Sequence, residues 1–187
     1  AVSPPLLKRL AEWARAEGLP LMVHAAESPE EVAFLARGEG PLREVYGRFA
    51  KTPWTPPGTT PVRHLHALGV LGPTTLLVHG VQVDEEEVGL LAETGTKVVL
   101  CPRSNANLEV GEAPLALYAK HGVELALGTD SRGSSPDLDV KNEARFLWGR
   151  AEPRLLVRAL TRGGYRALGL PTPRLTRGTP LSLVHFL

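Results

Sequence analysis

Polar side chains that can bind a metal ion or move protons stand at the ends of several apolar runs. His24 and Glu27 close the run LPLMVHAAE, His79 closes TTLLVH, and Asp130 closes VELALGTD. A histidine and an aspartate from different strands can supply two bonds to a hydrolytic zinc ion, which keeps one position for water. Glu27, three residues after a ligand histidine, can handle the protons of that water. His79 can hydrogen-bond the water or a developing oxyanion.

Further polar side chains follow the run TKVVLCP and the aspartate of GTDS. Arg103, Ser104, Asn105 and Ser131 offer polar contacts to a substrate, although asparagine and serine at such positions also hold turns. Trp54, in a proline-rich stretch, can stack on a planar ring or simply pack within its loop. Taken singly, each strand-end residue is more often a turn former or a helix cap. Together they converge on one rim if the strands are parallel neighbours.

The runs that carry these residues are short and continuously apolar, as in strands buried on both faces. Helical patterns alternate with them, which predicts a parallel α/β sheet. The segment 39–61 interrupts this order and is predicted to be a long loop before a helix over 61–69. The predicted strands cover 19–27, 74–79, 96–102 and 123–130, and the other predicted helices cover 3–17, 28–37, 84–95, 112–122, 138–148 and 153–168.

Composition excludes several classes of protein. The sequence has 187 residues, 43% of them hydrophobic, and a formal net charge of +1. This balance indicates a globular core and gives no electrostatic reason to expect nucleic-acid or membrane partners. The single cysteine, Cys101, excludes an intrachain disulfide framework and fits a reducing compartment, so we expect a cytoplasmic protein.

The remaining histidines and Cys101 are predicted to be structural. His64 and His66 fall in a helical pattern, where residues two apart point to opposite faces and cannot chelate one ion. His121 ends a predicted helix and His185 lies in the tail. Cys101 is expected to be a small core or rim residue rather than a nucleophile.

Four motifs in order, HAAE at 24–27, LLVHG around His79, CPRSN at 101–105 and GTDS at 128–131, resemble the metal-dependent amidohydrolase superfamily. The similarity is to its deaminase and chlorohydrolase branch. It implies a (β/α)₈ barrel with a small β-sandwich, one divalent metal (zinc, with iron as the alternative) and a small-molecule substrate. It also implies His24 and Asp130 as metal ligands, with Glu27, His79 and Asp130 as catalytic residues. A homodimer is compatible with this reading.

The family also places an HxH pair at the end of its first strand, and the sequence has no such pair on a strand. A barrel of this type needs eight strands and typically about 250 residues. We therefore expect residues 1–170 to be the C-terminal half of a barrel, holding strands five to eight, and 171–187 to begin the sandwich. The missing half would supply the HxH ligands.

The resemblance implies hydrolytic deamination of an aminated heterocycle or nucleoside-like substrate through a metal-bound hydroxide. Candidates are aminodeoxyfutalosine, adenosine-type and guanine-type compounds. Two alternatives stay open: another hydrolase of this scaffold, acting on a C–Cl or cyclic amide bond, and a fragment without catalytic activity.

Overall fold

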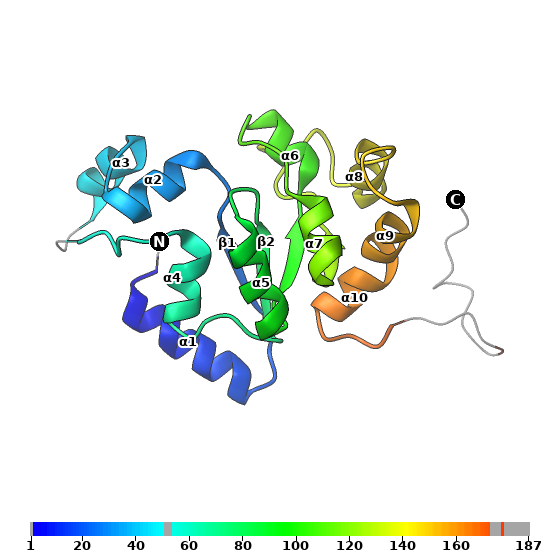
Figure 1. The fold of residues 1–187 in the computed structure, drawn as a ribbon, viewed down its shortest axis with the longest axis horizontal. Coiled ribbons are helices and arrows are strands. Elements are labelled where there is room, and N and C mark those ends of the chain that lie inside the picture. The colour runs from blue at the N-terminus through cyan, green and yellow to red at the C-terminus, as the bar shows by residue number, and fades with distance from the viewer. Residues whose placement is uncertain (1, 51–53, 173–176, 178–187) are drawn as a thin grey trace.

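A four-stranded parallel sheet forms the centre of the computed structural model, which describes residues 2–50, 54–172 and 177. The strands lie side by side in chain order, so that β1 and β4 are its two edges (Figure 1). Ala25 stands opposite His79, and Leu100 stands opposite Leu127, so the carboxyl ends of the strands meet at one edge of the sheet. The strands are β1 (Leu21–Ala25), β2 (Thr75–His79), β3 (Lys97–Leu100) and β4 (Leu125–Leu127). All lie within the predicted runs.

Helices separate the strands and flank the sheet. In Figure 1, α1 and α4 lie on the side of β1, and α8 to α10 lie on the side of β4. The last helical run contains a π-helical turn, η1. The bounds are α1 (Pro4–Ala16), α2 (Pro29–Arg37), α3 (Pro41–Phe49), α4 (Pro61–Ala67), α5 (Glu85–Thr94), α6 (Pro102–Asn107), α7 (Leu115–His121), α8 (Val140–Phe146), α9 (Pro153–Arg158), η1 (Ala159–Gly163) and α10 (Gly164–Ala167).

Local sequence signals explain where several helices begin. The Asp84 side chain accepts a hydrogen bond from the backbone N–H of Glu87, and the Glu87 side chain accepts one from Asp84 in return. Ser28 caps α2 by accepting from the N–H of Glu31 at 3.2 Å. These bonds satisfy N–H groups that the first helical turn leaves without partners. The sequence predicted both helix starts.

Helices form in two places where the sequence predicted none. In the segment 39–61, Pro41 begins α3, and Tyr46 from this helix packs against Phe34 of α2 with ring centroids 5.8 Å apart. After β3, Pro102 occupies the first turn of α6. Proline suits that position because its fixed φ fits a helix and its missing N–H has no partner there. Both helices therefore begin with a proline signal that the sequence prediction overlooked.

The two faces of the sheet have different surroundings. Leu77, Val98 and Leu125 point into the main hydrophobic core formed with the helices. The other face has a small cluster of Leu76, Ala126 and Ala167. Met22 lies on the same face of β1 as His24, because the two are two residues apart, and it is 52% exposed. This second face is thus less covered at the β1 edge.

None of the helices in the described part of the chain has both the length and the apolar character needed to cross a membrane. The strand predicted within the tail, and His185, lie outside the described residues.

Candidate active site

Three potential metal ligands meet at the carboxyl ends of the strands. His24 is in β1, His79 ends β2, and Asp130 follows β4. One ligand atom from each lies within 4.8 Å of the others, although Asp130 stands far from His24 in the sequence. The two imidazole rings are 5.3 Å apart between centroids. The parallel sheet therefore brings together three of the residues that the sequence singled out.

Glu27 lies beside this group. Its Oε1 is 3.5 Å from Nε2 of His79, and its side chain is 29% exposed, so it can exchange protons with a bound molecule. The backbone N–H of Glu27 donates to Oε2 of Glu31 at 2.9 Å, which fixes the turn between β1 and α2. Burial raises the pKa of Glu31, against the lowering effect of the backbone hydrogen bonds it accepts.

Two serine hydroxyls hold the carboxylate of Asp130. Ser104 and Ser134 both donate to its Oδ2, each at 2.7 Å. Burial opposes ionisation of Asp130, but these hydrogen bonds and the nearby histidines outweigh it and lower the pKa of the carboxyl. Asp130 is thus kept as a carboxylate, and its Oδ1 is the oxygen that neither serine occupies.

The side chain of Asn105 contacts the imidazole ring of His79. Its Oδ1 lies 2.8 Å from Nδ1 of His79, and both side chains are almost completely buried. The sequence predicted Asn105 as a substrate contact, but its carbonyl oxygen is already engaged by the protein.

The other predicted substrate contacts are also held by the chain itself. The guanidinium of Arg103 donates to both oxygens of Asp137, each at 2.9 Å. Ser131 Oγ accepts from the N–H of Gly133 at 3.1 Å. The ring of Trp54 stacks on Phe34, with centroids 4.1 Å apart. The structure thus groups Glu27 with the three potential ligands, and it gives Arg103, Ser131 and Trp54 partners within the protein.

The backbone is strained where the site is built. Ala26, His79 and Asp130 have φ values of 54°, 76° and 59°. Residues other than glycine seldom adopt this left-handed region of the backbone. Such residues cost on the order of 1–3 kcal/mol each and gather at functional sites. The strand ends are therefore bent in a way that packing elsewhere must stabilise.

Ser134 was missed by the sequence analysis. It reaches Asp130 because the chain turns back at once: the N–H groups of Ser134 and Ser135 both donate to the carbonyl of Ser131, at 3.2 and 2.8 Å. The run SRGSSP shows a turn-forming composition. That composition could have indicated a return toward Asp130, but not the hydroxyl that makes the contact.

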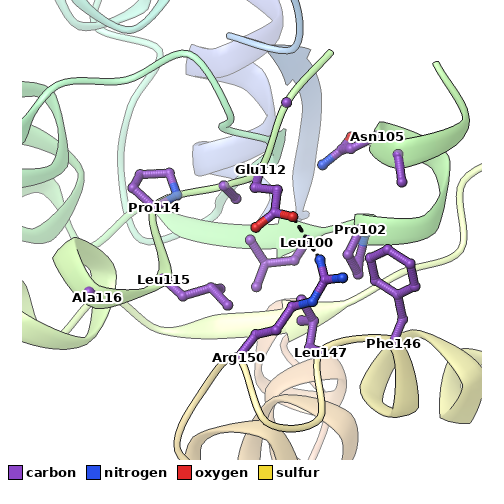
Figure 2. A pocket seen from close by; sticks show the side chains of 13 residues that line it. Leu100, Pro102, Asn105, Glu112, Pro114, Leu115, Ala116, Phe146, Leu147 and Arg150 are labelled. Carbon is purple, nitrogen blue, oxygen red and sulfur yellow. Dashed lines mark hydrogen bonds and ion pairs between the residues drawn. The ribbon is translucent and has the colours of Figure 1, made fainter. Parts of the chain in front are cut away.

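A cavity of about 210 Å³ lies between α6, α7 and α8, and Asn105 is one of its lining residues (Figure 2). Its walls are mostly apolar, and Arg150 pairs with Glu112 at 2.7 Å beside it. Leu100 lines it and belongs to the core on the helix side of the sheet. Asn105 lines this cavity but His24, Glu27, His79 and Asp130 do not, so the cavity borders the site without containing its potential metal ligands.

Of the described residues predicted to be structural, none belongs to the group of potential metal ligands. His64 and His66 lie on helix α4, with the buried Leu65 between them. His121 contacts Oε1 of Glu85 at 3.1 Å through Nε2. Cys101 is 1% exposed, and burial raises the pKa of its thiol to about 12.

A parallel α/β sheet with its polar cluster at the carboxyl ends of the strands is found in doubly wound and in TIM-barrel proteins, and the family and structural matches indicate the TIM-barrel type. The Amidohydrolase family model matches residues 1–186, and the chain belongs to that family. This confirms the family resemblance of the four motifs.

Relatives and solved structures agree with this assignment. The chain is 42% identical to an aminodeoxyfutalosine deaminase from Deinococcus radiodurans, over 95% of the chain and 45% of the relative. It is 30% identical to a 5-methylthioadenosine/S-adenosylhomocysteine deaminase from Aquifex aeolicus, over 97% of the chain and 40% of the relative. A solved adenosine deaminase from Xanthomonas campestris with bound zinc matches with a TM-score of 0.72 and 30% identity, over 90% of the chain and 37% of that protein. The chain thus spans less than half the length of these relatives.

Proposed function

We propose that this chain carries part of the active site of a metal-dependent aminohydrolase, which replaces the amino group of an adenine-type, nucleoside-like substrate with oxygen and releases ammonia. The observation that carries the proposal is the meeting of His24, His79 and Asp130 within 4.8 Å, with Glu27 in contact with His79. The names of the three deaminases reported above support the same reaction.

The donor set fits a divalent metal. His24 and Asp130 would hold the ion, since imidazole nitrogen and carboxylate oxygen both suit zinc. The zinc bound by the solved adenosine deaminase supports that choice of metal. When bound, such an ion lowers the pKa of a water molecule and so makes a nucleophile available near neutral pH.

Residues of this chain would accept and donate the protons that the reaction transfers. Oδ1 of Asp130 would accept a proton from the attacking water, because Oδ2 is engaged by two serines. Glu27 would protonate the ring nitrogen next to the reacting carbon, take up the hydroxyl proton of the tetrahedral carbon, and pass that proton to the departing amine. His79 would accept a hydrogen bond from the attacking water through Nε2 and so help to orient it. Loss of the amine as ammonia leaves a carbonyl on the ring.

We also propose that β1 to β4 occupy the positions of strands five to eight of a (β/α)₈ barrel, with residues 1–170 in the barrel and 171–187 starting the sandwich. The exposure of Met22 beside His24 supports this arrangement, since a closed barrel fills its interior with side chains.

Ammonia release by the full-length protein tests the reaction. We would compare aminodeoxyfutalosine, methylthioadenosine, S-adenosylhomocysteine and guanine with a chlorotriazine, and measure ammonia and chloride separately. Ammonia from an adenine nucleoside substituted at its 5′ position is the expected result. Chloride release alone would assign the protein to the chlorohydrolases, and no product with metal-loaded protein would contradict the proposal.

A further inference from the structure

We infer that Asn105 is a positioning residue, which holds the ring of His79 in the tautomer protonated on Nδ1. The inference rests on the proposed function for its kinetic consequence, but the protonation pattern of the ring can be measured whether or not the reaction is the proposed one.

The chemistry of the contact determines the tautomer. A carbonyl oxygen can only accept a hydrogen bond, so Oδ1 of Asn105, 2.8 Å from Nδ1 of His79, requires a proton on Nδ1. In the neutral ring the free electron pair is then on Nε2. That nitrogen faces Oε1 of Glu27 at 3.5 Å, on the reactive side of the ring. Asn105 thereby decides which nitrogen is available for the reaction.

Burial makes this contact difficult to replace. His79 is 1% exposed and Asn105 is 2% exposed, so water has little access to take over the hydrogen bond. A ring without its partner would keep an unsatisfied buried donor, or change to the other tautomer. The first result would destabilise the ring in its present position, and the second would put a proton on Nε2.

The helix that carries Asn105 is itself fixed. The N–H of Arg103 donates to Oε2 of the buried Glu143 at 3.0 Å, and the Arg103 guanidinium is bound to Asp137. The next residue, Ser104, donates to Asp130. Three consecutive residues of α6 therefore make separate polar contacts, and the last two hold site residues from β2 and β4. This arrangement explains how a six-residue helix can set the position of an amide.

A direct measurement is nitrogen NMR of the full-length protein, loaded with zinc and labelled in its histidine rings. The His79 signals would be assigned by their loss in His79→Gln. We expect a protonated Nδ1 and an unprotonated Nε2. An unprotonated Nδ1 with a protonated Nε2 would overturn the inference, because Asn105 would then be donating through its amide nitrogen.

Variants of Asn105 test the consequence for the reaction. Asn105→Ala should lower kcat about 10- to 100-fold, the usual effect of losing such a supporting contact, with KM changed little. Asn105→Asp, which keeps an acceptor oxygen, should recover much of the loss and preserve the protonated Nδ1. Asn107→Ala is the matched control, because Asn107 is an exposed asparagine of the same helix.

A raised KM with unchanged kcat in Asn105→Ala would identify Asn105 as a substrate contact and overturn the inference. If Asn105→Ala does not fold, the wild-type spectrum and Asn105→Asp still decide the tautomer. An absence of ammonia release with the expected protonation pattern would reject the proposed function alone.

Discussion

Oε1 of Glu27 lies 3.5 Å from Nε2 of His79, and the two residues come from the ends of neighbouring strands. A carboxylate at that distance can exchange protons in the site while remaining free of the metal. Glu27→Gln preserves the shape of the side chain and removes its acid–base function. We expect turnover to fall by about 100- to 10,000-fold with metal content unchanged.

Ammonia release and metal analysis of the same full-length samples would check this prediction. Unchanged turnover would reject the proton-transfer role of Glu27. A parallel loss of metal would instead place Glu27 among the groups that hold the ion.

The two serines on Asp130 predict an effect on metal affinity. Removing either hydroxyl, in Ser104→Ala or Ser134→Ala, takes a hydrogen bond from Oδ2 and loosens the carboxylate. We expect metal affinity to fall about 10- to 100-fold in each variant, measured by competition with a chelator. Thr161→Ala is the control, because its hydroxyl is exposed and donates to the carbonyl of Val157 within its own helical run. Equal affinities in all three variants would contradict the role of the serines.

The sequence predicted the strands and the strand-end residues because both depend on local patterns. An apolar run followed by His24, His79 or Asp130 indicates a strand and its end. The partners of the site residues depend on contacts between distant segments, such as Asn105 with His79, or on a tight turn, as for Ser134. A list of residue types could not distinguish an amide that binds substrate from one that holds a histidine. The assignment of Asn105 to the substrate therefore needed the structure.

The buried thiol of Cys101 should be unreactive in the folded protein. Its pKa of about 12 follows first from burial and then from the nearby charges of Asp130 and Glu143. At pH 8 only about one thiol in ten thousand would be the reactive thiolate. Treatment with iodoacetamide and mass analysis of the peptide containing Cys101 should find it unmodified, whereas denatured protein should be alkylated. Equal rates in both states would contradict the burial of this residue.

The ion pair between Arg103 and Asp137 predicts a pH-dependent contribution to stability. The guanidinium holds the pKa of Asp137 well below its ordinary value of 3.8. A group whose pKa is lower in the folded state stabilises above the unfolded value and loses that effect as pH falls. Asp137→Asn should therefore lower the Tm at neutral pH, and the difference from wild type should shrink as the pH falls below about 3.8. A difference that is constant with pH would contradict this role.

Gly163 and Gly164 are adjacent helical glycines with opposite surroundings. A Cβ at Gly163 would overlap the carbonyl oxygen of Leu125 in β4, whereas a Cβ at Gly164 meets nothing within 4 Å. Gly163→Ala should therefore destabilise the protein by about 1–3 kcal/mol or more, because neither backbone can move without disturbing the sheet.

Gly164→Ala should stabilise the protein by about 0.4–1 kcal/mol, because alanine restricts the unfolded chain at a position with ordinary helical angles. Urea unfolding of the two variants would measure both effects. Similar stabilities would contradict the close contact of η1 with β4, which positions the strand that leads to Asp130.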